Sequence, residues 1–92
     1  MSKVVVIGTG TMGVGIAAGF LASGTETIIL GRSSEKALTC LEAIKSCADS
    51  INPTWSEKNP ALRSGSIESW QDWDAVNLVI ETVSEQLQLK KE

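Results

Sequence analysis

Three glycines near the N-terminus carry the clearest chemical pattern in this chain. Gly8, Gly10 and Gly13 have the spacing G-x-G-x-x-G and directly follow the apolar run 4–7. In a strand-to-helix turn, the first glycine permits the tight bend, the second lets backbone approach a pyrophosphate, and the third lets the helix pack closely on the strand. The helix directs its free N–H groups and positive dipole end at the phosphates. A plain glycine-rich turn is the alternative to this phosphate-binding turn, whose predicted residues are Gly8, Thr9, Gly10, Thr11, Met12 and Gly13.

A second candidate site lies at the end of the next apolar run, residues 25–30. Where a dinucleotide site selects NAD, an acidic residue about twenty positions beyond the glycines accepts hydrogen bonds from the adenosine ribose. Gly31 stands at this position, and Arg32 and Ser33 follow it. An arginine beside a hydroxyl can hold a 2′-phosphate through charge-assisted hydrogen bonds of about 1.5–3 kcal/mol each, whereas a carboxylate would repel it. We therefore predict NADP as the preferred cofactor and NAD as the second choice. The alternative is a solvated arginine and a serine that only caps a helix.

The elements that would position these residues are a parallel sheet and the helices that connect its strands. Apolar, β-branched runs predict strands, and apolar residues repeating every three or four positions predict helices. In chain order we expect a strand at 4–7, a helix at 11–23, a strand at 25–30, a helix at 35–50, a loop at 53–66, a short strand at 67–70, a strand at 75–83 and a helix from 86. A right-handed helical crossover joins the first two strands, and the last strand lies beside the first. This pattern predicts an α/β fold, the first half of a Rossmann-type doubly wound parallel sheet.

The helix expected at 11–23 contains several glycines. Each glycine inside a helix costs on the order of 1 kcal/mol relative to alanine. Gly13, Gly15 and Gly19 therefore predict a buried helix whose backbone closely approaches the sheet or a ligand.

The composition argues against several classes of function. With 92 residues the chain forms at most one domain, and its net charge of −3 offers no basic surface for nucleic acid. No apolar run reaches the ~20 residues of a membrane span, so we expect a cytoplasmic protein without a membrane partner.

The titratable side chains do not form a recognisable catalytic or metal site. The chain has no histidine, which removes the commonest general base and zinc ligand, and we expect no metal site. Cys40 and Cys47 would lie about 10 Å apart on one helix, beyond the roughly 7 Å that a disulfide spans, so buried free thiols are expected. Asp72 and Asp74 are expected to be solvated turn residues.

Two segments together are similar to a known family. Residues 5–17 carry the glycine pattern with a methionine before its last glycine. Residues 77–90 form a strand that ends in Ile80-Glu81 and continue through Glu85 to Lys90. This pair of segments resembles the cofactor-binding domain of the L-3-hydroxyacyl-CoA dehydrogenases. The glycine pattern also occurs in the 6-phosphogluconate and 3-hydroxyisobutyrate dehydrogenase families, so the second segment is the more discriminating one.

The resemblance implies a role for each matched residue. It places residues 8–13 on the pyrophosphate, and Glu85 and Lys90 near the nicotinamide ribose. A helix cap and a solvated charge are the alternatives for these two. Family members usually carry an aspartate where this chain has Gly31, and this departure puts the usual NAD preference in question. By the resemblance, residues 1–92 are the N-terminal part of a dinucleotide-binding domain without catalytic residues of its own.

The resemblance also implies what this chain lacks. The family's Ser-Asn segment, its catalytic His-Glu pair, and a helical substrate and dimerisation domain all follow downstream, and none is present here. The parent enzyme would oxidise a 3-hydroxyacyl thioester to the 3-oxoacyl thioester, bind an acyl-CoA-type substrate and form a homodimer. Alternatives that share the glycine pattern are an NADP-dependent β-hydroxyacid dehydrogenase, a flavin-binding Rossmann half and a non-catalytic nucleotide-sensing module.

Overall fold

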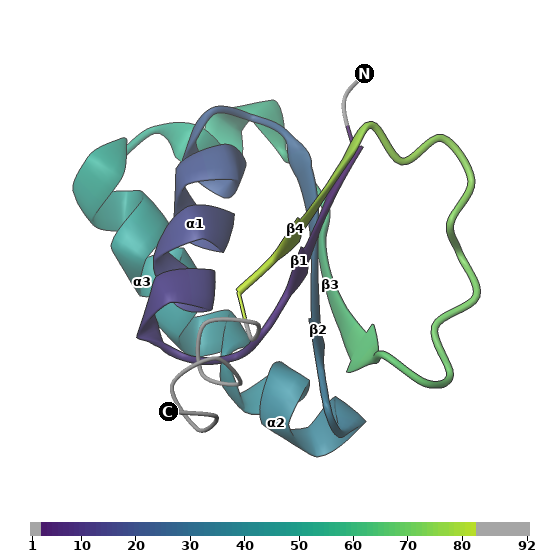
Figure 1. The fold of residues 1–92 in the computed structure, drawn as a ribbon. Coiled ribbons are helices and arrows are strands. Elements are labelled where there is room, and N and C mark those ends of the chain that lie inside the picture. The colour runs from purple at the N-terminus through teal and green to yellow at the C-terminus, as the bar shows by residue number, and fades with distance from the viewer. Residues whose placement is uncertain (1–2, 83–92) are drawn as a thin grey trace.

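The computed structural model describes residues 3–82, which form a four-stranded sheet with helices along one side (Figure 1). The elements are β1 (Lys3–Ile7), α1 (Thr11–Ala22), β2 (Glu26–Gly31), α2 (Ser34–Thr39), α3 (Leu41–Ile51), the short 3₁₀ helix η1 (Trp55–Lys58), β3 (Leu62–Ser66) and β4 (Leu78–Glu81). The strand order is β3-β2-β1-β4, and all neighbouring pairs are parallel. The predicted Rossmann-like sheet is confirmed, with the last strand beside the first.

β1 is an inner strand whose side chains are buried on both faces of the sheet. Val4 and Val6 belong to a cluster with residues of α1 and α3. Val5 belongs to a second cluster, with Ile28 and Leu30 of β2. Because consecutive side chains of a strand point to opposite faces, a strand covered on both sides requires an unbroken apolar run.

α1 packs along one side only, so the prediction of a buried helix is wrong for its other side. The side against the sheet and α3 is formed by Gly13, Ala17, Ala18, Leu21 and Ala22. On the opposite side Gly15 and Gly19 are exposed, and a Cβ added to either would meet no described atom within 4 Å. Met12 is also half exposed, at 50%. Of the three glycines predicted to approach the sheet or a ligand closely, only Gly13 lies against neighbouring backbone.

The helix predicted at 35–50 is divided at Cys40 into α2 and α3. The Cys40 amide donates to the Ala37 carbonyl at 3.2 Å, a bond over three residues that tightens the end of α2. The break lets α2 lie against the end of β2 while α3 packs along α1 (Figure 1). Cys40 and Cys47 are free thiols, but the prediction that they are buried is wrong, because Cys47 is exposed and Cys40 is only partly buried.

β3 occupies Leu62–Ser66, a segment predicted as loop, and the strand predicted at 67–70 is wrong. This strand has one large apolar side chain and pairs in parallel with β2. Its Arg63 guanidinium lies 3.0 Å from the Glu26 carboxylate of β2. Backbone pairing and this ion pair hold β3 in the sheet, which explains why its residue types do not predict a strand.

The connection from β3 to β4 runs along the second face of the sheet without a helix (Figure 1). Trp70 from this connection packs against the second cluster, and Arg63 lies over its ring at 5.3 Å from the centroid. The Asp72 carboxylate is 2.9 Å from Lys3 Nζ and 2.7 Å from Arg63 Nη2. Asp72 is solvated as predicted, with its side chain 40% exposed. Its two ion pairs, which the sequence did not predict, also fasten the connection to β1 and β3.

β4 forms one edge of the described sheet and is shorter than the strand predicted at 75–83. Leu78 and Val79 are 45% and 47% exposed, because β4 has only β1 as a neighbour among the described strands. Its carboxyl end nevertheless lies beside that of β1, where Ile7 pairs with Glu81.

Candidate nucleotide-binding site

The glycine turn joins β1 to α1 at the carboxyl edge of the sheet. Gly8 has a φ of 127°, a value that residues with a side chain rarely adopt. Its amide donates to the Leu30 carbonyl of β2 at 2.8 Å. The turn thus begins at a fixed place on the edge where open parallel sheets bind their ligands.

Gly13 is closely packed, whereas Gly10 faces open space. A Cβ on Gly13 would collide with the carbonyl oxygen of Gly8, so α1 can lie this close to the turn only with glycine at this position. A Cβ on Gly10 would meet no described atom within 4 Å. Gly13 therefore allows close packing, while the backbone of Gly10 leaves room for a ligand.

The N-terminus of α1 is open. Gly10 is its N-cap, without a capping side chain, and the first turn contains no acidic residue. The Val14 amide donates to the Gly10 carbonyl at 3.0 Å, so the amides of Thr11, Met12 and Gly13 precede the first helical hydrogen bond. Free amides at the positive end of a helix dipole suit phosphate oxygens. The residues present therefore fit a pyrophosphate.

Two side chains that were not predicted to belong to the site support the turn. The Thr82 hydroxyl donates to the Ile7 carbonyl at 3.0 Å and would lie 3.5 Å from a Cβ on Gly13. The Cys40 thiol donates to the Thr9 carbonyl at 3.4 Å, and its partial burial raises the pKa of this thiol. Thr82 could have been inferred from its place after a parallel strand. Cys40 could not, because it reaches the turn through a helix break that residue spacing does not indicate.

Gly31, Arg32 and Ser33 lie beside the turn, because β2 neighbours β1 in the sheet. Gly31 is buried, whereas Arg32 is exposed and makes no ion pair within residues 3–82. The Ser33 hydroxyl oxygen accepts a hydrogen bond from the Lys36 amide at 3.2 Å, which makes Ser33 the N-cap of α2. Its O–H remains able to donate to a ligand. The structure thus brings together the two groups of candidate residues, at the glycine turn and at the end of β2.

Residues 3–92 match the family described as 3-hydroxyacyl-CoA dehydrogenase, NAD binding domain. The chain belongs to this family. The family match confirms the predicted resemblance and identifies an NAD-binding domain of the oxidoreductase class.

Two solved structures show the same fold in longer 3-hydroxyacyl-CoA dehydrogenase chains. The (S)-3-hydroxybutyryl-CoA dehydrogenase from Ralstonia eutropha has a TM-score of 0.71 and 22% identity, over 99% of this chain and 35% of its own. The 3-hydroxyacyl-CoA dehydrogenase from Archaeoglobus fulgidus has a TM-score of 0.53 and 23% identity, over 98% of this chain and 29% of its own. This chain therefore spans about a third of the length of either relative. No curated protein sequence matches it.

Two family-based expectations fall outside what the structure describes. Glu85 and Lys90, predicted near the nicotinamide ribose, lie outside residues 3–82.

Within residues 3–82, no helix has the length and apolar character needed to cross a membrane.

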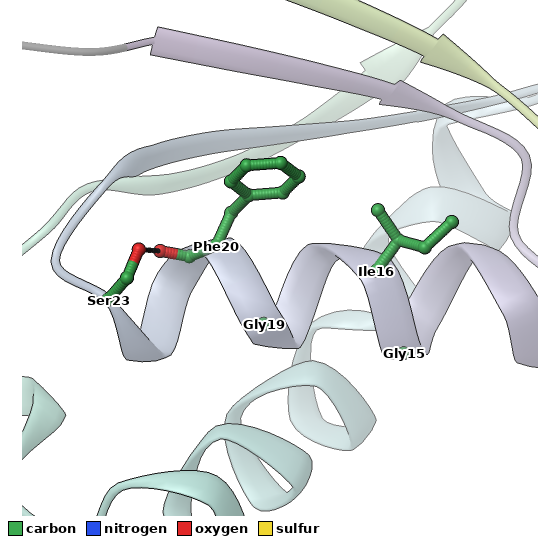
Figure 2. Close-up of a pocket in the computed structure, with 5 residues that line it drawn as sticks. All are labelled: Gly15, Ile16, Gly19, Phe20 and Ser23. Carbon is green, nitrogen blue, oxygen red and sulfur yellow. Dashed lines mark hydrogen bonds between the residues drawn. The ribbon is translucent and has the colours of Figure 1, made fainter.

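A depression along α1 is separate from the glycine turn of this 3-hydroxyacyl-CoA dehydrogenase domain, and two residues of its lining, Ile16 and Phe20, also pack against the core (Figure 2). It has a volume of about 350 Å³ and is lined by Gly15, Ile16, Gly19, Phe20 and Ser23. The Ser23 hydroxyl, the one polar side chain of this lining, donates to the Phe20 carbonyl at 2.7 Å. The lining offers no charge for phosphate, so we do not include the depression in the nucleotide site.

Proposed function

We propose that this chain binds a nicotinamide dinucleotide with its pyrophosphate at the start of α1, as the N-terminal part of the cofactor domain of a 3-hydroxyacyl-CoA dehydrogenase. The observation that carries the proposal is the uncapped helix start at Gly10, in a chain that matches the NAD-binding domain of this family over residues 3–92. Residues 8–13 would surround the pyrophosphate, and Glu85 and Lys90 would lie near the nicotinamide ribose.

We propose further that the parent enzyme oxidises a 3-hydroxyacyl thioester to the 3-oxoacyl thioester. The cofactor supplies the hydride acceptor for this chemistry. Because this chain has no histidine, we assign the general base and the acyl-CoA-type substrate site to sequence outside these 92 residues. We also expect the parent to be a homodimer. The part played by this chain is then to bind and orient the dinucleotide.

Arg32 favours NADP as that dinucleotide. It is exposed without an ion-pair partner in the described residues, and Gly31 places no side chain at the end of β2. The Ser33 hydroxyl beside it can donate a hydrogen bond. A 2′-phosphate would gain charge-assisted hydrogen bonds worth about 1.5–3 kcal/mol each, which NAD cannot form. NADP should therefore bind more tightly, with NAD as the weaker ligand.

Fluorescence titration of the chain with NADPH and NADH tests these proposals. Gly10→Ala should preserve the fold, because its Cβ meets open space, and should weaken both dinucleotides by about tenfold or more, because the Cβ occupies the room for the pyrophosphate. Gly19→Ala is the matched control, since it also adds a Cβ in open space on α1 and should keep full binding. Equal binding by the two variants would contradict the pyrophosphate site. Tighter binding of NADH than of NADPH would contradict only the cofactor preference.

A further inference from the structure

The space at the end of β2 is filled by a side chain from the glycine turn. Gly31 is buried, and a Cβ built on it would lie 2.6 Å from Cγ2 of Thr9. The same Cβ would lie 3.5 Å from the Ser33 carbonyl oxygen and 3.7 Å from the Ala37 amide nitrogen, which are ordinary contacts. The Thr9 methyl group is therefore the nearest obstacle to a side chain at position 31 within residues 3–82.

The backbone around Thr9 is held from two sides. The Gly8 amide donates to the Leu30 carbonyl at 2.8 Å, which ties the turn to β2. The Cys40 thiol donates to the carbonyl of Thr9 at 3.4 Å, which ties it to the start of α3. The smallest movement that could admit a side chain at position 31 is therefore a rotation of the Thr9 side chain itself.

We propose that Thr9 and Gly31 form a steric pair in which the Thr9 methyl group leaves no space for an acidic side chain at position 31, and that this pair maintains the preference for a 2′-phosphate. This inference rests on the proposed function, in which the ribose lies between the glycine turn and the end of β2. A carboxylate at position 31 would occupy this space and repel the phosphate. Thr9 would oppose any carboxylate introduced at position 31, while Arg32 supplies the positive charge.

With this steric pair, the choice between NADP and NAD depends on positions 9 and 31 together. If the space beside Gly31 were open, Gly31→Asp alone would restore an NAD-type site. With the Thr9 methyl in its present position, the new Cβ would come closer than side-chain carbon atoms normally approach. Gly31→Asp alone must therefore turn the β-branched Thr9 side chain out of its rotamer or strain the end of β2. The methyl group and not the hydroxyl of Thr9 causes the contact. The effects of substitutions at positions 9 and 31 should therefore be strongly non-additive.

A double-mutant cycle in two matched backgrounds tests the pair. Thr9→Ser removes Cγ2 and keeps the hydroxyl, whereas Thr9→Val keeps Cγ2 and replaces the hydroxyl by a second methyl. Gly31→Asp is introduced into the wild-type chain and into both backgrounds. The probes are 2′,5′-ADP and 5′-AMP, which differ only in the 2′-phosphate. Isothermal titration calorimetry measures their affinities, and thermal unfolding reports on the fold of each variant.

The wild-type chain should bind 2′,5′-ADP about tenfold or more tightly than 5′-AMP. In the Thr9→Ser background, Gly31→Asp should shift this ratio towards 5′-AMP by about tenfold or more while the chain stays folded. In the wild-type and Thr9→Val backgrounds, Gly31→Asp should lower the unfolding temperature and weaken both probes.

Three results would count against the pair, and they are distinguishable. The same shift from Gly31→Asp in the Thr9→Ser and Thr9→Val backgrounds would overturn the steric pair. Equal wild-type affinity for the two probes would overturn it as well, while leaving the dinucleotide site intact. If the wild-type chain binds neither probe but still binds NADPH and NADH, the pair has no role in recognising the adenosine part, and only the absence of binding to any of the four ligands would overturn the proposed function as well.

Discussion

At the scale of single residues, the glycine turn owes its shape to partners that are distant in the sequence. The Thr9 carbonyl accepts from Cys40, and the Ile7 carbonyl accepts from Thr82. Backbone amides bind phosphate well only when they are already directed at it, because reorienting them would consume part of the binding free energy. These two contacts therefore belong to the candidate site although neither side chain needs to touch a ligand.

Cys40 provides a chemical test of this arrangement. Its pKa is raised above the ordinary value of 9.0 by burial, so its thiol remains protonated to a higher pH than an exposed thiol would. At pH 8 iodoacetamide should alkylate the exposed Cys47 several-fold faster than Cys40, and the difference should narrow as the pH rises above 9.0. Mass spectrometry of Cys40→Ser and Cys47→Ser variants separates the two rates. Alkylation of Cys40 should weaken dinucleotide binding, whereas equal rates at pH 8 would show that Cys40 is not held at the turn.

At the scale of elements, ion pairs hold the connection between β3 and β4 against the sheet. Hydrogen bonds from Lys3 and then from Arg63 lower the pKa of Asp72 below its usual 3.8. A carboxyl group whose pKa is lower in the folded than in the unfolded chain stabilises the fold at every pH above its unfolded pKa. This contribution disappears as the pH falls through the pKa of the folded chain. The ion pairs should therefore contribute fully at neutral pH, begin to weaken below about pH 4 and be lost once the pH falls below the native pKa of Asp72.

Asp72→Asn tests this connection by removing the charge while keeping the shape. We expect the thermal midpoint at pH 7 to fall by roughly 2–6 °C, and the difference from wild type to vanish at the acid end of a pH series followed by circular dichroism. Asp74→Asn is the control, because Asp74 contributes only its backbone carbonyl to Lys3 and makes no ion pair within the described residues. A fall of the same size in the control would show that the Asp72 ion pairs do not hold the connection.

The elements also show how far local residue types predict the fold. β1 and β2 were predictable because Val4–Ile7 and Ile28–Leu30 are unbroken apolar runs, as buried parallel strands require. β3 was not, because Leu62–Ser66 has little apolar content and is held by pairing with β2 and by Arg63. Ile67 and Trp70 have strand-favouring side chains, but Ile67 is exposed and Trp70 packs against the sheet from a loop. Tertiary contacts determine the secondary structure of residues 62–66 and 67–70, and local residue types do not reveal such contacts.

In the candidate site, too, some features follow from the sequence and others only from the fold. The positions of Gly8 and Gly13 follow from spacing alone, because each meets a local backbone requirement. The position of the Thr9 methyl group in the space beside Gly31 depends on how β1 and β2 are aligned in the sheet, and no pattern of residue types indicates it. The division at Cys40 is likewise hidden, because the helical residue pattern continues on both sides of it.

At the scale of the whole molecule, the two faces of the sheet are covered differently. Helices α1 and α3 lie on one face, and the loop-like connection from β3 to β4 runs along the other (Figure 1). The candidate nucleotide site lies at the carboxyl edge of the sheet, where the turn after β1, the end of β2 and Thr82 meet. A ligand at this edge would contact several elements at once. Binding should therefore stabilise the whole fold and not only the turn.

The rise of the thermal unfolding midpoint on adding dinucleotide measures whether binding stabilises the whole fold. A ligand that binds only the folded chain at 100 times its Kd stabilises it by about 2.7 kcal/mol, which for a chain of this size corresponds to a rise in the midpoint of roughly 10–20 °C. At equal concentrations NADPH should raise the midpoint more than NADH does, because only NADPH offers a phosphate to Arg32. Arg32→Ala should reduce the NADPH shift to that of NADH, while Lys45→Ala, which removes an exposed positive charge on α3, should leave both shifts unchanged. Equal shifts in the wild-type chain, or an NADPH shift that survives Arg32→Ala, would show that Arg32 does not recognise the 2′-phosphate.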